Sequence, residues 1–126
     1  MPRDCPFCLG NITQQILHAN EHAFAILDLY PVSKGHHLII TKRHVPDYFS
    51  LTPEEKSSID NLIGVTRASL LSSDNSITGF NIGVNIGASA GQTIFHVHIH
   101  IIPRRDGDTP NPRGGVRGVI PTRMGY

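Results

Sequence analysis

The most regular pattern in the chain is an alternation of polar and apolar residues between positions 95 and 102. Successive side chains of an extended chain point to opposite faces, so this alternation predicts a β-strand. The three histidines of the segment share one face, and Val97, Ile99 and Ile101 share the other. Pro103 is expected to close the strand.

Four further strands are predicted along the first 85 residues. Two short runs, Gln15–Ala19 and Ala23–Leu27, are separated by a polar turn and predict a hairpin. The apolar run His37–Thr41 predicts a third strand that is buried on both faces. Phe80–Asn85 alternates and predicts a fourth strand. The glycine-rich residues 87–91 then predict a loop whose backbone can approach a ligand.

One long helix is predicted between the third and fourth strands. Thr52 is a suitable N-cap, Pro53 suits the first helical position, and Glu55 completes a capping box. The helix is expected to extend to about Leu71. Residues at steps of three and four should pack on the sheet; these are Ile59, Leu62, Ile63, Thr66 and Leu70.

Length and composition are typical of a single domain. A chain of 126 residues with 39% hydrophobic content can bury one core without disulfide bonds. It has no apolar run of about 18 residues that could cross a bilayer, and no apolar stretch of a secretory signal near Met1. We therefore expect a cytoplasmic protein with no membrane partner.

Charge is unevenly distributed along the chain, although the formal net charge is only +1. Residues 104–126 carry five arginines and a net charge of +3, whereas the preceding residues carry −2. The small total argues against a nucleic-acid partner bound by broad phosphate neutralisation, but it is compatible with a compact anionic ligand. Because residues 106–115 have turn composition, we predict that residues 104–126 form an extended basic arm.

The histidines are the main candidates for chemistry, because His96, His98 and His100 fall within five positions. The unperturbed pKa of a histidine side chain is near 6.5, so at neutral pH most of it is uncharged. The uncharged imidazole is a nucleophile that can form a covalent intermediate with phosphorus. Two other interpretations stay open on these residues alone. They are ordinary solvent-facing histidines, or a three-histidine metal site that activates water.

The segment around these histidines resembles the signature of the histidine triad (HIT) superfamily. Its core motif is residues 91–104, Gly-Gln-Thr-Ile-Phe-His-Val-His-Ile-His-Ile-Ile-Pro-Arg. Further matching residues are Asp28, Gly35-His36, Lys42-Arg43-His44 and Asn85. The resemblance covers about residues 5–104, and it weighs against the three-histidine metal site.

Together with the predicted elements, this resemblance implies an α+β fold of the HIT type. We expect an antiparallel sheet of about five strands, one long helix and a short N-terminal zinc knuckle. Residues 1–103 form the HIT domain in this interpretation, and residues 104–126 are the arm of the same domain. Members of the superfamily are usually homodimers whose strands form one larger sheet, so we expect a homodimer.

The resemblance also implies catalytic roles. His98 is the nucleophile that forms a nucleotidyl-histidine intermediate, and His100 and Gln92 help to hold the phosphate or the leaving group. His36 is similar to an upstream histidine that supports the triad. Such a nucleophile divides one difficult phosphoryl substitution into two in-line displacements, and fixed donors stabilise charge on the non-bridging oxygens.

Nucleotide-binding residues follow from the same resemblance. Asp28 is similar to the carboxylate that takes the ribose hydroxyls, a role that suits a bidentate acceptor. Asn85 lies on the sugar side and Thr93 on the phosphate side. The full expected set is Asp28, Asn85, Gln92, Thr93, His98 and His100. Taken alone, Asp28 and Asn85 are also ordinary turn residues.

Two cysteines, Cys5 and Cys8, form a C-x-x-C pair. Such a pair is often half of a tetrahedral zinc site, which needs two more ligands. The resemblance to zinc-containing HIT proteins implies His44 and His96 for these. Four protein ligands close the coordination sphere, so the zinc would be structural. The alternative is a thiol redox pair, which normally opens a helix, whereas this segment is expected to precede a hairpin.

The function we expect is hydrolysis of a nucleotide at its α-phosphorus, with a dinucleoside polyphosphate as substrate and a nucleoside monophosphate as product. Residues 108–117 resemble the arm of prokaryotic members called dinucleoside polyphosphate hydrolases, and Arg113 and Arg117 could pair with distal phosphates. A solvated basic tail is the alternative for this arm. Alternative activities are hydrolysis of nucleoside phosphoramidates and nucleotidyl transfer. An alternative of another class is a zinc-structured nucleotide-binding module with little turnover.

Overall fold

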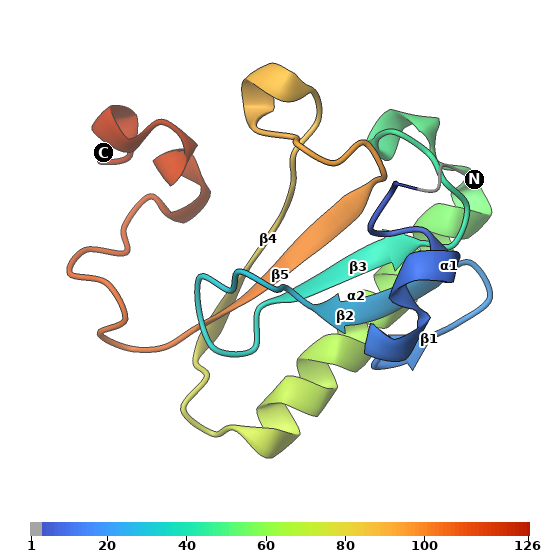
Figure 1. The fold of residues 1–126 in the computed structure, drawn as a ribbon. Helices are drawn as coiled ribbons and strands as arrows, with labels where there is room; N and C mark the ends of the chain where they lie inside the picture. The colour runs from blue at the N-terminus through green and yellow to red at the C-terminus, as the bar shows by residue number, and fades with distance from the viewer. Residues whose placement is uncertain (1–3) are drawn as a thin grey trace.

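The computed structural model describes residues 4–126 and contains a five-stranded antiparallel sheet within them. The strand order is β1-β2-β3-β5-β4, which puts β5 in the interior and β4 at an edge (Figure 1). The strands are β1 His18–Ala19, β2 Ala23–Leu27, β3 His37–Thr41, β4 Gly79–Val84 and β5 His98–Arg104. The homodimer expected above stays a prediction.

The predicted hairpin is present, but its first strand is much shorter than expected. β1 pairs with β2 only through His18 and Ala19. Gln15, the first residue of the predicted strand, instead ends a 3-10 helix, Thr13–Gln15, which follows helix α1, Leu9–Ile12. In this arrangement Ile12 is in the core, with 3% exposure. β2 and β3 have the predicted bounds, and all five residues of β3 are buried.

β5 begins three residues later than predicted and continues through Pro103. Val97 donates its backbone N–H to the Val45 carbonyl, 2.9 Å away, so the chain bends before the strand begins. At the other end, the carbonyl of Arg104 faces the β4 side of the strand. Neighbouring residues of a strand direct their backbone groups to opposite sides, so the nitrogen of Pro103 faces the β3 side. Pairing with β3 does not extend beyond Ile101. The missing N–H therefore breaks no hydrogen bond of the sheet.

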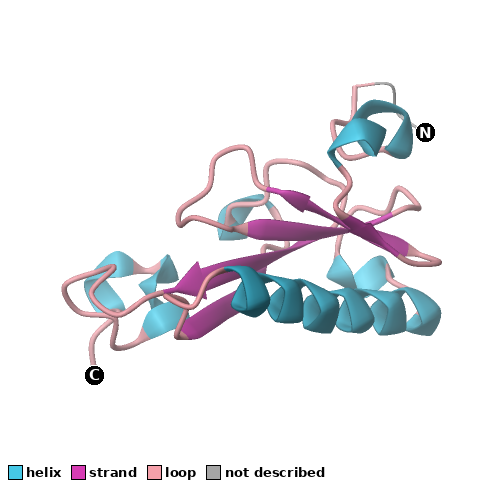
Figure 2. Ribbon diagram, turned by 90° about the horizontal axis from the view of Figure 1, so that it is seen from below, coloured by secondary structure: helices cyan, strands magenta, loops and turns pink. Residues whose placement is uncertain are grey.

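Helix α2, Pro53–Ser73, is the predicted long helix, two residues longer than expected. Its capping box is present: the Glu55 N–H donates to Thr52 Oγ1 at 3.1 Å, and the Thr52 N–H donates to Glu55 Oε1 at 2.9 Å. The helix lies along one face of the sheet (Figure 2). No helix in residues 4–126 is long and apolar enough to span a membrane.

Two hydrophobic clusters cover the two faces of the sheet. The cluster between the sheet and α2 includes Ile39, Ile99 and Ile101, together with Ile59 and Leu62 of the helix. The cluster on the opposite face joins residues 5–12 to the other side chains of β2 and β3, namely Phe24, Ile26, Leu38 and Ile40. Since alternate residues of β5 point to alternate faces, its histidines lie on the face opposite α2.

The C-terminal segment is not extended throughout. It contains two 3-10 helices that the sequence pattern did not predict, Gly115–Val119 and Pro121–Arg123. The guanidinium groups of Arg113 and Arg117 lie 5.1 Å and 4.8 Å from the ring centre of Tyr126. This segment lies beside the β4 edge of the sheet, away from α1 (Figure 1). The domain boundary at residue 103 stays a prediction.

Candidate functional site

A cavity of about 710 Å³ lies on the sheet face opposite α2. The polar lining residues, called the polar wall below, include most of those expected at the site: Asp28, His36, Asn85, Thr93, His98 and His100. The apolar lining residues, called the apolar wall below, include Phe7, Ile12, Ile26, Leu38 and Ile94. The two sets are neighbours, since Leu38 pairs with His100 in the sheet. A cavity lined by both kinds of side chain suits a ligand that combines charged groups with an aromatic ring.

The orientation of His98 leaves one ring nitrogen free. Nδ1 lies 2.8 Å from the carbonyl oxygen of His96, and because a carbonyl can only accept, Nδ1 carries the proton. The lone pair is therefore on Nε2. Burial lowers the pKa of His98, so the imidazole is neutral at pH 7. The ring of Phe7 contacts His98 edge-on, with 4.9 Å between ring centres.

His36 and His100 form a hydrogen-bonded pair with a defined proton. The Val32 N–H donates to His36 Nδ1 at 3.1 Å, so a neutral His36 carries its proton on Nε2. Nε2 then donates to His100 Nδ1, 2.9 Å away. Burial, together with His98 and His36, lowers the pKa of His100 to about 4. A neutral His100 with Nδ1 occupied carries its remaining N–H on Nε2.

Asp28 lies beside this pair at the end of β2. Its Oδ2 is 3.3 Å from His36 Nε2, and its Oδ1 accepts a hydrogen bond from the Tyr30 N–H at 2.8 Å. Burial lowers the pKa of His36, an effect that the negative charge of Asp28 opposes. The hydrogen bond from Tyr30 therefore holds the Asp28 carboxylate in the lining of the cavity.

Gln92 lies away from the cavity lining, unlike the other residues expected to contact the nucleotide. Its side chain is buried, with 4% exposure, and bonds only to backbone groups. Oε1 accepts from the Gly87 N–H at 2.9 Å, while Nε2 donates to the carbonyls of Pro46 at 2.6 Å and Ile94 at 3.2 Å. These contacts hold the loop that carries Thr93.

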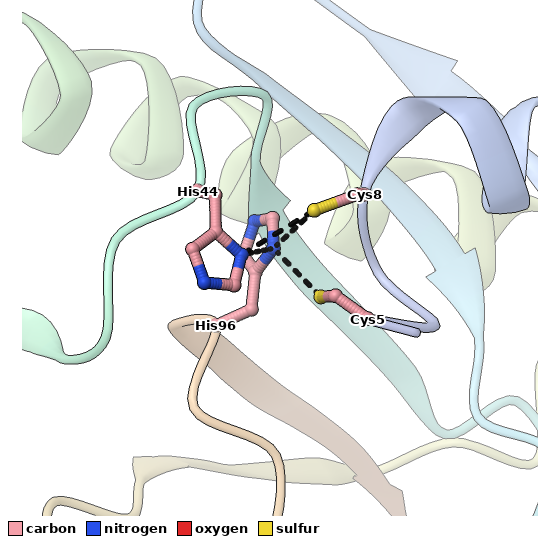
Figure 3. A group of neighbouring side chains, drawn as sticks. All are labelled: Cys5, Cys8, His44 and His96. Carbon is pink, nitrogen blue, oxygen red and sulfur yellow. Dashed lines mark hydrogen bonds between the residues drawn. The ribbon is translucent and has the colours of Figure 1, made fainter. Parts of the chain in front are cut away.

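Cys5, Cys8, His44 and His96 form a second cluster, and none of them lines the cavity (Figure 3). Their candidate ligand atoms lie within 4.8 Å of one another. Cys5 Sγ is 3.4 Å from His96 Nδ1, Cys8 Sγ is 3.3 Å from His44 Nδ1, and the two Nδ1 atoms are 3.3 Å apart. A tetrahedral zinc site with bonds of about 2.0 to 2.3 Å has edges of about 3.3 to 3.8 Å.

The tautomer of His96 also fits a metal ligand. Its Nε2 donates to the Thr41 carbonyl at 2.7 Å, so the lone pair is on Nδ1, which points into the cluster. Burial and the neighbouring Cys5 raise the pKa of the Cys8 thiol to about 11, so a cation is needed to hold it as a thiolate. These four residues are positioned to bind a metal ion.

This arrangement excludes the three-histidine metal site and changes one argument about the C-x-x-C pair. The triad histidines do not converge on one point, because His96 belongs to the cysteine cluster whereas His98 and His100 line the cavity. A three-histidine hydrolytic metal site is therefore not formed. The C-x-x-C segment does open a short helix, α1, contrary to expectation, but each thiol lies against an imidazole nitrogen.

The apolar wall is the part of the site that the sequence pattern missed. In the sequence, Ile26 and Leu38 have the pattern of ordinary strand residues. The pattern does not distinguish an apolar side chain that faces a cavity from one that faces the core. The position of Phe7 could have been inferred in part from the sequence. It lies between Cys5 and Cys8, so a metal site that joins these cysteines to His96 also brings Phe7 close to His96.

A model of the HIT domain family matches residues 10–107. The chain therefore belongs to the HIT domain family, and its α+β fold matches solved members of that family. The structure of a HIT family protein from Bacillus anthracis superposes with a TM-score of 0.77 at 39% identity, covering 86% of this chain and 78% of that one.

Curated relatives of several kinds are similar to the chain. A HIT-like protein of Mycoplasma pneumoniae is 40% identical over 104 residues, 80% of this chain and 72% of the relative. A bis(5'-nucleosyl)-tetraphosphatase of Schizosaccharomyces pombe is 33% identical, and adenylylsulfatase HINT3 of Arabidopsis thaliana is 37% identical; each alignment covers 86% of this chain. The chain spans only 59% and 56% of these two relatives, respectively.

One solved relative bears on the cysteine cluster. A Zn-bound histidine triad family protein from Mycobacterium smegmatis has a TM-score of 0.74 at 29% identity, covering 96% of this chain and 93% of that one. Relatives named for the hydrolysis of nucleotides and a zinc-bound neighbour therefore both lie within the family.

Proposed function

We propose that the protein hydrolyses dinucleoside polyphosphates at an α-phosphorus through a covalent intermediate on His98. One observation carries the proposal: a neutral His98 whose proton is held on Nδ1 presents an unprotonated Nε2 beside a cavity with a polar wall. A binding protein has no need of such a nucleophile. The name of the Schizosaccharomyces pombe relative supports the substrate class.

The reaction would proceed in two displacements. His98 Nε2 forms a bond to the α-phosphorus while the bond to the bridging oxygen of the leaving group breaks, and the leaving group keeps that electron pair. Water then attacks the same phosphorus and loses a proton, while the phosphorus–nitrogen bond breaks and its electrons return to Nε2. The products are a nucleoside monophosphate and the shortened nucleotide.

Other residues of the cavity would hold the substrate. The Nε2–H of His100 is a donor for a phosphate oxygen, and the hydrogen bond from His36 fixes its ring. Asp28 would accept from the ribose hydroxyls, with Asn85 on the sugar side and Thr93 on the phosphate side. The apolar wall around Phe7 would pack against the base.

Zinc is the metal we propose for Cys5, Cys8, His44 and His96. Two thiolates and two imidazoles at these spacings are a ligand set typical of structural zinc, and the zinc-bound relative supports the choice. With four protein ligands the ion would have no open position. It would order residues 5–12 and fix His96, whose carbonyl orients His98.

The function is tested by measuring nucleoside monophosphate release from diadenosine tetraphosphate, adenosine 5′-phosphosulfate and AMP phosphoramidates. His98→Ala should lower kcat by at least about 10³-fold, because the covalent step is lost. The matched control is His22→Ala, a histidine of the β1–β2 turn that does not line the cavity. Mass spectrometry of the quenched wild-type reaction should locate the nucleotidyl adduct on His98.

The alternatives give different results in the same assay. Preference for phosphoramidates or for the phosphosulfate would keep the nucleophile and replace the substrate class. Activity that survives in His98→Ala would rule out the covalent mechanism. A wild-type protein that binds AMP but releases no product from any substrate would be a binding module.

A further inference from the structure

Residues 5–12 are folded back on themselves by hydrogen bonds within the segment. The Cys8 N–H donates to the Cys5 carbonyl at 3.3 Å, and the Asn11 N–H donates to the Cys8 carbonyl at 2.8 Å. The Asn11 side chain donates to the Cys5 carbonyl at 2.8 Å. Helix α1 is a single turn without a side-chain hydrogen bond at its N-cap. Because a helix of one turn is not stable by itself, the order of this segment depends on its attachment to the rest of the domain.

Apolar packing and thiol contacts both attach this segment to the domain. The segment packs in the hydrophobic cluster on β2 and β3. Each thiol also contacts an imidazole nitrogen, at 3.4 Å for Cys5 and 3.3 Å for Cys8 (Figure 3). A thiol is a weak hydrogen-bond donor, whereas bonds of about 2.0 to 2.3 Å to a shared zinc ion would be strong. The strength of the attachment therefore depends on the metal.

Phe7 extends from this segment into the cavity. It lies between the two cysteines in the sequence, and its side chain is buried. Its ring is edge-on to two imidazoles, with 6.3 Å between ring centres for His96 in the cysteine cluster and 4.9 Å for His98 in the cavity. Pro6 and Ile12 of the same segment line the cavity as well. A displacement of the segment would therefore move part of the apolar wall and the ring that contacts His98.

We propose that Phe7 is a positioning residue that couples zinc binding in the cysteine cluster to nucleotide binding in the cavity. This proposal rests on the proposed function and deepens it, because it makes the affinity for the nucleotide depend on the metal. A base that packs on Phe7 favours the attached segment, and the attached segment holds both thiols beside their imidazoles. The coupling is reciprocal: zinc strengthens nucleotide binding by the same factor by which the nucleotide strengthens zinc binding.

The first test measures both affinities in the wild-type protein. AMP is titrated calorimetrically into zinc-loaded protein and into protein stripped with a chelator. Zinc affinity is measured by competition with a chromogenic chelator, with and without saturating AMP. AMP should bind about tenfold more weakly to the stripped protein, as if the segment were attached in about a tenth of the molecules, and AMP should tighten zinc binding by about the same factor. Equal AMP affinities for the two forms would overturn the proposal.

Phe7→Leu tests the role of the ring, because leucine keeps the position apolar but is too short to replace the contact with His98. The variant should hold zinc by elemental analysis, and the ratio of its AMP affinities with and without zinc should fall below about twofold. Phe49→Leu is the matched control and should keep the wild-type ratio, because Phe49 is 79% exposed and does not line the cavity. A wild-type ratio in Phe7→Leu would overturn the proposal and assign the coupling to the His96 carbonyl that holds His98.

Amide hydrogen exchange gives a readout that needs no variant. Stripping the wild-type protein should speed exchange in residues 5–12 more than in α2, and saturating AMP should slow it there again. Equal acceleration in both segments would overturn the proposal, because the metal would then act only through the stability of the whole fold. A zinc-loaded protein that does not bind AMP would overturn the proposed function together with this inference.

Discussion

Gln92 illustrates how a single side chain can serve a site without touching its ligand. Three backbone groups from different segments depend on its amide: the N–H of Gly87 and the carbonyls of Pro46 and Ile94. Pro46 lies two residues after His44, and Ile94 lies two residues before His96. The amide therefore joins the loop that carries Thr93 to the segments that carry His44 and His96.

Gln92→Leu should destabilise the fold by about 1–3 kcal/mol, because it leaves buried backbone groups without partners. Urea denaturation measures this loss, with Gln14→Leu as the control at an exposed position. Turnover should fall in parallel as the loop loosens. A large loss of turnover with wild-type stability would instead show direct contact between Gln92 and the phosphate.

Glu55 holds the start of helix α2 through two kinds of contact. It completes the capping box and also accepts two hydrogen bonds from Arg43, at 3.0 Å from Nε and 2.8 Å from Nη2. The hydrogen bonds from Arg43 lower the pKa of Glu55 below its ordinary value of 4.5. The helix is thereby tied to the segment that leads into His44.

The pH dependence of stability follows from that lowered pKa. A carboxylate with a depressed pKa stabilises the fold above its unfolded pKa, and this stabilisation is lost as the pH falls through the folded value. Glu55→Gln should therefore cost about 1–3 kcal/mol at pH 7, and the difference from wild type should shrink below pH 4.5. Urea titrations across this range measure it; a constant difference would contradict the assignment.

The elements were predictable to the extent that local pattern decides them. β2, β3 and α2 have strong local signals, namely dense apolar runs and a capping box, and the structure confirms them. β5 was misplaced by three residues, because the bend at residues 95–97 depends on a hydrogen bond to Val45, which is distant in sequence. The cavity residues Asp28 and His36 were found by motif, whereas the apolar wall required the fold.

The metal cluster connects distant parts of the whole molecule. It joins the N-terminal segment to the loop after β3 and to the residues before β5, and Cys5, Phe7, Cys8 and Ile12 all belong to one hydrophobic cluster. Because these four residues are brought together only by folding, the binding free energy of a metal ion held there would stabilise the fold.

The purified protein should accordingly hold about one zinc per chain by elemental analysis. Cys8→Ser should lose the metal and lower Tm by about 10 °C or more, whereas Ser57→Ala on the exposed side of α2 should do neither. A metal-free preparation with wild-type Tm and full activity would exclude structural zinc.

The sequence separation between the cysteines and His96 also determines when the cluster can form during translation. Cys8 and His96 are 88 residues apart, and translation adds about 5–20 residues per second. For about 4 to 18 seconds, both thiols have therefore been synthesised while His96 does not yet exist. A nascent chain must keep both cysteines reduced through that interval, and it can assemble the cluster only when most of the domain has been made.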